Sequence, residues 1–341
     1  MFKKFLVVTL AALMLLIAGC GNKVVYDDLS NYDNLFGADE SGLYKNPLTG
    51  LAEFQDKEVT TRRPIAVMIE NSSESIPVQT NVCSADIIYE TETEGGITRL
   101  MAVYQDISSL EKLGNVRSAR YDFIDLAMGH NAIYVHCGQD PHYAKPHLKD
   151  LDDLSIDTNS QGAIRIPNGL ASWHTLYAIG TDLWENIKGK FETQTENPVV
   201  WQDFTNEKIT LDGGSATKVT IPFPTTKTQF EYDETTGLYT RLFRDEAHKD
   251  YFTEEKTYVK NVFVLLTDMG YFPKEGRRDI DLISGKGYYI TNGTVKEINW
   301  AKGDAAEAFK FTDESGAAIK VSAGNSWVCI ANKETCKPDI Q

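Results

Sequence analysis

Short turn sequences recur through the second half of the chain, and they constrain its fold more than any other feature. Apolar runs of strand length are separated there by "DETTG", "SGKG", "TNGT" and "DESG". Glycine and asparagine at such positions accept the positive φ angles of tight hairpin turns. Helix signals are nearly absent, so we predict an antiparallel β domain over residues 206–341. Its expected strands are 217–223, 228–233, 238–244, 258–267, 279–283, 287–291, 294–300, 308–312, 317–322 and 326–331.

The preceding segment, residues 62–205, has a different pattern and predicts a mixed α/β domain. "RPIAVMIEN" is typical of a buried strand, and two alternating runs around Gly95-Gly96 indicate a hairpin. A crossover unit is expected to follow, made of strand 97–105, helix 118–129 and strand 132–137. The fold class is therefore α+β, with a mixed α/β N-terminal domain followed by an antiparallel β-rich C-terminal domain.

The amino terminus predicts an exported, lipid-anchored protein. Residues 1–19 combine Lys3 and Lys4 with a short apolar run, which is the layout of a signal peptide. Small residues directly before Cys20 are typical of a bacterial lipoprotein signal, in which that cysteine is acylated, for example with palmitate. Two or more acyl chains hold a protein stably at a bilayer. We expect the body on the outer, extracytoplasmic face of the cell membrane, with residues 20–61 as a polar tether.

The balance of charge argues against nucleic acid as a partner. The chain carries 34 basic and 49 acidic side chains. Cleavage of the signal removes Lys3 and Lys4, so the mature balance is 32 minus 49, or −17. An acidic surface repels nucleic acid and anionic headgroups. The acyl group rather than a basic patch must therefore hold the protein at the membrane.

Cysteine and histidine positions define no metal or cofactor site. Besides Cys20 the chain has four cysteines, of which Cys329 and Cys336 bracket a short turn and are the easiest pair to bridge. Bridged and free forms both stay open. His142 and His147 lie among several aspartates without a fixed ligand spacing, and no phosphate-binding or dinucleotide motif is present. We expect neither a cofactor nor a metal.

The segments "NVRSAR" and "AIYVHCG" indicate an anion site. If Ser118 caps the predicted helix, Arg117 and Arg120 lie at its amino end, and His136 lies at the end of the next strand. A helix amino terminus already carries partial positive charge, so a negative group is needed nearby. That group is either internal or a bound phosphate or carboxylate. The internal candidates, all on the preceding hairpin, are Glu90, Glu92 and Glu94.

Several separated segments, in order, carry a family resemblance. They are "RPIAVMIEN", "ADIIYETETEGGITR", "NVRSAR", "AIYVHCG", "HTLY", "NVFVLL" and "GKGYYITNGTVKEINW". Over nearly all of the mature chain, the sequence resembles the YerB-like bacterial lipoproteins, which pair an N-terminal and a C-terminal domain of unknown function. The resemblance implies no reaction. It implies that the family's motif positions are Glu94, Gly95, Gly96, Thr98, Arg99, Arg117, Ser118, Arg120, His136, His174 and Tyr177.

Two functions from different classes follow from these residues. The first is a non-catalytic envelope module that binds an anionic group, on a cell-wall polymer or on a wall-assembly protein. Its expected ligand-binding residues are Arg99, Arg117, Ser118, Arg120, His174 and Tyr177. The second is a hydrolase or lyase that acts on such a polymer, with Glu94 or His136 as acid or base. A third interpretation, in which the arginines form only structural ion pairs, also stays open.

Replacing Cys20 with alanine tests the predicted anchor. Because the acyl chains are the only predicted attachment to the bilayer, Cys20→Ala should release the protein from the membrane fraction or mislocalise it. Cell fractionation followed by immunoblotting measures the distribution, and Cys83→Ala serves as the matched control. Continued membrane retention of a processed Cys20→Ala protein would contradict the prediction.

Overall fold

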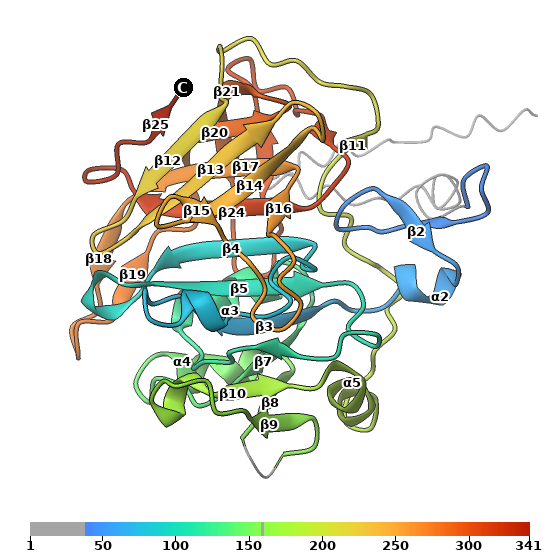
Figure 1. Cartoon of the computed structure of the whole chain (residues 1–341), viewed down its shortest axis with the longest axis vertical. Helices are drawn as coiled ribbons and strands as arrows, with labels where there is room; N and C mark the ends of the chain where they lie inside the picture. The colour runs from blue at the N-terminus through green and yellow to red at the C-terminus, as the bar shows by residue number, and fades with distance from the viewer. Residues whose placement is uncertain (1–37, 158–159) are drawn as a thin grey trace, which may run out of the picture.

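The computed structural model describes residues 38–157 and 160–341 (Figure 1). The predicted signal peptide, Cys20 and the first part of the tether lie outside the described residues. Within the described ranges, no helix is both long enough and apolar enough to cross a membrane. The end of the tether forms a small antiparallel pair from β1 (Tyr44–Lys45) and β2 (Ala52–Phe54).

Ten of the described strands form one mixed sheet that contains both halves of the chain (Figure 1). Their order is β22-β21-β20-β17-β24-β4-β5-β3-β7-β8. The first half of the chain supplies β3 (Ile65–Glu70), β4 (Ile87–Glu92), β5 (Thr98–Tyr104), β7 (Ile133–His136) and β8 (Asp153–Ser155). The second half supplies β17 (Asn261–Thr267), β20 (Ser284–Thr291), β21 (Thr294–Ala301), β22 (Lys310–Thr312) and β24 (Ser326–Asn332).

Strand β24 joins the two halves of this sheet. It pairs in parallel with β17 on one side and with β4 on the other, so that Trp327 lies opposite both Val262 and Ile88. The expectation of an antiparallel domain over residues 206–341 is therefore wrong at β24. Turn sequences report pairings between consecutive strands, whereas parallel strands are joined by long connections that leave no local signal. The boundary between residues 62–205 and 206–341 stays a prediction, and the two segments share this sheet.

A second sheet is antiparallel throughout, as the pattern of hairpin turns predicted. It lies in front of the upper part of the large sheet in Figure 1. Its strands are β12 (Lys218–Pro222), β13 (Lys227–Asp233), β14 (Leu238–Phe243), β15 (Glu246–Ala247), β16 (Tyr258–Val259) and β25 (Asp339–Ile340). Strand-rich structure with few helices agrees with the α+β class.

The predicted turn sequences serve two different purposes. In "TNGT", Asn292 and Gly293 have φ angles of 51° and 75° and link β20 to β21 as a tight turn. "SGKG" is instead the first half of β20, so the turn predicted there is wrong. A Cβ on Gly285 would lie 2.7 Å from the ring of Trp300 in the adjacent strand. This glycine permits close packing between strands, which the sequence pattern did not distinguish from a turn.

The large sheet has a separate apolar core on each face. On the face towards the second sheet, Phe230 of β13 meets the ring of Trp327 edge-on, with 5.6 Å between ring centroids. On the opposite face, α3 (Tyr121–Met128) packs Phe123 and Ile124 into a core that includes Met101 of β5. The strands between the two cores are therefore buried on both sides, which explains their nearly continuous apolar sequences.

Helix α3 is shorter than predicted, and Ser118 is not its cap. Its N-cap is Arg120, which makes no side-chain capping bond, and Gly129 ends it as expected. The amides of Ala119 and Cys137 bond to the oxygens of Gly138 and Arg117. Because these bonds keep the backbone extended up to Arg120, the helix cannot begin at Ser118.

Smaller elements complete the fold around these layers. The short helices are α2 (Lys57–Thr60), α4 (Ala144–His147) and α5 (Gly180–Lys188). The 3-10 turns are η2 (Ile76–Val78), η3 (Glu94–Gly96), η4 (Leu148–Asp150) and η5 (Ser172–His174). The remaining strands are β6 (Leu113–Gly114), β9 (Ala163–Arg165), β10 (Leu176–Ala178), β11 (Phe204–Thr205), β18 (Met269–Tyr271), β19 (Arg278–Ile280) and β23 (Val321–Ser322).

The carboxylate of Glu90, in β4, ties the second sheet to the large one. It is fully buried and accepts hydrogen bonds from Asn71 Nδ2 at 2.9 Å, from Thr98 Oγ1 at 2.9 Å and from Thr228 Oγ1 at 2.8 Å. Trp327 Nε1 donates a further bond at 2.9 Å. Thr228 belongs to β13, so the bond crosses between the sheets. A buried carboxylate is stable only with such a set of donors.

Arg241 of β14 supplies a positive charge next to this network. Its guanidinium lies 4.5 Å above the ring centre of Trp327 and donates to Asn71 Oδ1 and Gln79 Oε1, both at 2.9 Å. Burial lowers the pKa of Arg241 to about 10, while the charge of Glu90 raises it. The arginine therefore stays charged near neutral pH and adds a second polar link between the sheets.

Removing the Glu90 carboxylate should weaken the attachment of the second sheet. Glu90→Leu leaves several buried donors unsatisfied and should lower the free energy of unfolding by about 3–5 kcal/mol. Glu90→Gln keeps one acceptor oxygen and should cost less. Urea denaturation followed by circular dichroism measures both, with Glu234→Leu in the exposed turn between β13 and β14 as the control. Equal losses for Glu90→Leu and Glu234→Leu would contradict the role given to Glu90.

Candidate functional site

The carboxyl ends of β3, β4 and β7 meet the amino end of β5 at one edge of the large sheet. The predicted crossover has the wrong topology, because β3 lies between β5 and β7 and runs antiparallel to β5. Arg99 nevertheless reaches this edge, since it lies at the start of β5, while Glu70 and His136 lie at the ends of β3 and β7. The sequence pattern identified these strands but not which strands lie next to each other in the sheet.

Arginine side chains gather at this edge, and we call them the arginine cluster. Three come from the region predicted from sequence, and two come from the β18–β19 hairpin of the second half of the chain. The members are Arg99, Arg117, Arg120, Arg277 and Arg278.

Carboxylates of the protein neutralise four of the five arginines. Arg117 pairs with Glu70, which is buried at the end of β3, and Arg278 pairs with Glu92 at the end of β4. The anion expected at this edge is thus largely internal. Glu70 was not among the predicted internal candidates, because its place beside Arg117 depends on the pairing of β3 with the segment before α3.

Glu94 pairs with two arginines from different halves of the chain. Arg120 contacts both of its carboxylate oxygens, and Arg277 Nη1 lies 3.1 Å from Oε1. Arg277 also donates from Nε to Asp140 Oδ1 at 2.9 Å. Burial alone raises the pKa of Glu94, but the hydrogen bond and charge of Arg120, with the charge of Arg99, outweigh it and hold the pKa at about 2. Glu94 is therefore an ionised carboxylate at neutral pH.

Sequence reasoning missed Arg277 and Arg278. Both belong to the run "EGRRD", where two adjacent arginines follow a glycine. The β18–β19 hairpin carries it to the edge of the first-half strands, where Phe272 stacks on Tyr143 with 4.2 Å between ring centroids. Adjacent arginines in a turn were the available signal, but nothing local indicated where the hairpin docks.

Arg99 is the exception in the cluster. Its side chain is almost completely buried, with the residue 2% exposed, and no carboxylate of the described residues lies within ion-pair distance. Nη1 donates to the main-chain oxygen of Ser118 at 2.9 Å, and Nε has no hydrogen-bond partner within the described chain. Burial and repulsion from Arg120 lower the pKa of Arg99 to about 10, although the negative charges of Glu70 and Glu94 raise it. Arg99 remains a cation at neutral pH.

Tyr134, on β7, provides a second buried polar atom beside Arg99. Its buried hydroxyl lies next to the main-chain amide of Arg120 and makes no hydrogen bond to a side chain of the described residues. Burial raises the pKa of Tyr134, and the positive charges of Arg99 and Arg120 oppose that rise. A buried cation, a buried hydroxyl and the uncapped amino end of α3 thus lie together. This arrangement suits an oxyanion, because each group donates hydrogen bonds or positive charge.

His136 lies close to this region but is fully occupied. Its ring is buried, with Nδ1 2.8 Å from the oxygen of Gly138 and Nε2 3.0 Å from Asp153 Oδ2. Both ring nitrogens therefore have partners inside the protein. This arrangement orients the ring and holds β7 to β8.

His174 follows the residue that Arg117 contacts, whereas the hydroxyl of Tyr177 contacts Val78 and Asn168. Arg117 Nη1 donates to the oxygen of Trp173 at 3.2 Å, next to His174, whose Nδ1 lies 2.6 Å from Ser75 Oγ. The Tyr177 hydroxyl donates to the Val78 oxygen at 2.9 Å, and burial raises its pKa to about 12. Asn168 links the two residues, because its Nδ2 donates to the His174 oxygen at 3.0 Å and to the Tyr177 hydroxyl at 3.1 Å.

The three glutamates named as internal candidates do not share one site. Glu90 lies in the network between the sheets, Glu92 pairs with Arg278, and Glu94 stands in the turn η3 with Arg120. The turn rotates Glu94 out of the strand pattern. Each carboxylate therefore has its own partners.

The described cysteines and histidines form no metal site. In residues 38–157 and 160–341, no group of three or more His, Cys, Asp or Glu side chains could hold a metal ion. His142 contacts Glu275, and His147 contacts Asp125 and Asp150. The cysteines are free, including the predicted pair, and they are Cys83, Cys137, Cys329 and Cys336.

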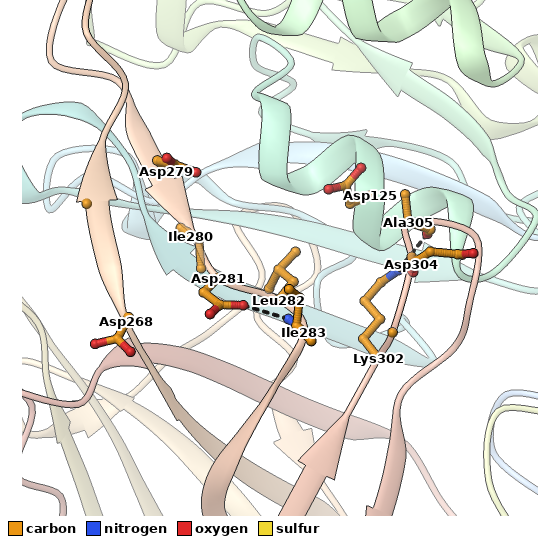
Figure 2. Close-up of a pocket in the computed structure, with 12 residues that line it drawn as sticks. Asp125, Asp268, Asp279, Ile280, Asp281, Leu282, Ile283, Lys302, Asp304 and Ala305 are labelled. Atoms are coloured by element: carbon orange, nitrogen blue, oxygen red, sulfur yellow. Dashed lines mark hydrogen bonds between the residues drawn. The ribbon is translucent and has the colours of Figure 1, made fainter. Parts of the chain in front are cut away.

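An acidic cleft of about 450 Å³ lies on another part of the surface (Figure 2). Lys302 lines it, donates from Nζ to the main-chain oxygen of Asp304 at 3.1 Å, and has a pKa that burial lowers to about 8. The cleft contains none of the arginine cluster, and its negative charge disfavours an anion. Its aspartates are Asp125, Asp268, Asp279, Asp281 and Asp304.

These features define a strand-rich protein with a shared sheet and an arginine-lined edge, and comparison with known proteins identifies its family. Residues 48–194 match "Protein of unknown function (DUF3048) N-terminal domain", and residues 219–328 match the corresponding C-terminal domain. The chain belongs to this DUF3048 family, which includes YerB.

Two comparisons with YerB support this assignment. The chain is 31% identical over 268 residues to "Putative lipoprotein YerB" of Bacillus subtilis (strain 168), which covers 75% of this chain and 77% of the relative. The crystal structure of YerB protein from Bacillus subtilis matches with a TM-score of 0.73 and 27% identity, over 86% of this chain and 99% of that one.

Replacing two arginines in turn should distinguish an arginine that has a carboxylate partner from one that has none. Arg117→Met leaves the buried Glu70 carboxylate without its cation and should lower the free energy of unfolding by about 3 kcal/mol. Arg99→Met removes a buried charge that has no carboxylate partner, so the change should stay within about 1 kcal/mol or be stabilising. Urea denaturation in phosphate-free buffer measures both. A loss for Arg99→Met as large as that for Arg117→Met would mean that Arg99 is an ordinary structural ion.

Proposed function

We propose that this protein is a lipid-anchored module of the cell envelope that binds an anionic group and carries out no chemistry on it. The lipoprotein signal before Cys20 and the lipoprotein name of the YerB relative support the anchor and the extracytoplasmic location. The ligand would belong to a cell-wall polymer or to a partner protein of wall assembly. Arg99, Arg117, Ser118 and Arg120 would form the binding region.

The buried guanidinium of Arg99, which has no carboxylate within ion-pair distance among the described residues, is the observation that carries this proposal. The chain neutralises the other members of the arginine cluster with its own carboxylates. Arg99 is therefore the one member that lacks such a partner among the described residues. Glu70 and Glu94 act on Arg99 only from beyond ion-pair distance, so its burial costs stability that a bound anion would restore. Proteins retain such local costs most often where they bind a ligand.

A phosphate or a carboxylate would satisfy the free donors. Arg99 Nε and the Tyr134 hydroxyl can each donate to an oxyanion, and the uncapped amino end of α3 adds main-chain N–H groups. Arg117 and Arg120 are partly exposed and already paired, so they would shape the entrance and attract the anion. His174 and Tyr177 would support the entrance through their shared partner Asn168.

The alternative, a hydrolase or lyase with Glu94 or His136 as acid or base, has less support. A general acid needs a raised pKa, whereas Arg120 and Arg99 hold the pKa of Glu94 at about 2. Glycan cleavage also uses two carboxylates at a defined separation. Here the nearest candidate, Glu92, is paired with Arg278. Binding therefore accounts for the edge better than catalysis does.

Anion-dependent thermal stability tests the proposal. The full chain in detergent micelles is titrated with inorganic phosphate and, separately, with acetate, and the melting temperature is followed by intrinsic fluorescence. An anion at ten times its dissociation constant should stabilise the native protein by about 1.4 kcal/mol. The comparison of the two anions distinguishes a phosphate site from a carboxylate site.

Two variants complete this experiment. Arg99→Met should abolish the anion-dependent rise, and Arg62→Met, at the opposite end of β3, should preserve it. No rise with either anion, or an equal rise in Arg99→Met, would reject the binding module. Release of new sugar ends from wall fragments by the native protein, lost in Glu94→Gln, would support the hydrolase instead.

A further inference from the structure

Trp173 differs from the other tryptophans of the chain in its exposure to solvent. It is 58% exposed, whereas Trp184, Trp201, Trp300 and Trp327 are buried at 8% or less. Burying an indole is among the most favourable contributions that a side chain makes to folding. An indole held in solvent by a well-ordered turn therefore requires an explanation outside the stability of the fold.

The turn that carries Trp173 is held rigidly. All three main-chain oxygens of η5 accept bonds from side chains: Arg165 Nη1 donates to Ser172 at 2.6 Å, Arg117 Nη1 to Trp173 at 3.2 Å, and Asn115 Nδ2 to His174 at 3.0 Å. The next side chain is buried, which leaves the indole outside. An aromatic ring fixed in this way loses little conformational entropy on binding.

Arg117 connects this indole to the proposed anion site. Its Nε contacts Glu70 within the arginine cluster, while Nη1 holds the oxygen of Trp173. The charge of Arg117 also lowers the pKa of Arg99, after the larger effects of burial, Arg120, Glu70 and Glu94. The turn that carries Trp173 is thus bonded to a residue of the proposed binding region, and the exposed indole is placed to contact the uncharged part of a ligand that reaches Arg117.

We infer that Trp173 is a stacking platform for a saccharide ring, so that the anionic group bound at Arg99 belongs to a sugar-bearing polymer. This inference rests on the proposed anion site. A sugar ring has a face of C–H groups that packs on an indole, while its hydroxyls remain in water. An exposed, rigid indole beside a site for one anion matches a ligand that alternates such rings with acidic groups.

Nucleic acid combines rings and anions too, but the surroundings do not favour it. Nucleic-acid binding draws most of its strength from several phosphate contacts at once. In the described part of the arginine cluster, Arg99 alone lacks a carboxylate partner, and the whole chain has a net charge of −15. One anion with a neighbouring neutral ring fits this surface better than a dense polyanion.

Matched oligomers test the inference on the full chain in detergent micelles. Short glycerol phosphate oligomers are prepared bare, with a pendant glucose, and with a pendant hexyl group, and binding is measured by calorimetry. The native protein should bind the glucosylated oligomer roughly five- to tenfold more tightly than the bare one. Trp173→Ala should bind both like the bare oligomer, and Trp173→Phe should retain part of the preference.

The control is Ile283→Ala, which removes an equally exposed apolar side chain, 63% exposed, from the acidic cleft and should change neither affinity. Equal affinity of the native protein for bare and glucosylated oligomers would overturn the saccharide platform while the anion site stands. An equal gain from the hexyl group would assign Trp173 to a general apolar surface instead. Absence of binding for all three oligomers, together with no response to phosphate or acetate, would remove the proposed function itself.

Discussion

The buried carboxylate of Glu90 is the contact on which the rest of this structure depends. It accepts hydrogen bonds from the loop after β3, from β5, from the second sheet and from β24, and those segments are distant in the sequence. Apolar packing alone brings sheets together without specifying their register. A buried charge with several required donors does specify it, because any other docking would leave the carboxylate unsatisfied.

The arginine cluster differs from the Glu90 network in how its charges are paired. Within the cluster, charges of both halves of the chain neutralise each other, as with Arg277 and Glu94, so docking of the β18–β19 hairpin and formation of the edge are one event. Arg99 departs from that rule. A fold that compensates its neighbours but leaves this one buried cation unpaired retains a local cost, and the exposed Trp173 nearby is a second such cost. The proposed ligand would account for both.

Sequence patterns predicted the parts of this arrangement that depend on short-range geometry. The hairpins around Gly95-Gly96 and Asn292-Gly293 were recognisable because their turns need positive φ angles. The expectation that Arg117, Arg120 and His136 lie at one sheet edge rested on their places at the ends of elements. The predicted crossover, the cap at Ser118 and the turn at "SGKG" were wrong, since each depended on neighbours that are remote in the chain.

The sequence by itself thus determined the strand-rich composition, the hairpins and the position of the arginines along the chain, and it predicts a lipoprotein leader. Only the tertiary structure decided which carboxylate neutralises which arginine, and that Arg99 has none among the described residues. The physical reason is the range of the interactions involved. Turn and helix preferences act over a few residues, whereas ion pairing and parallel strand pairing join segments that the sequence separates by up to about 240 positions.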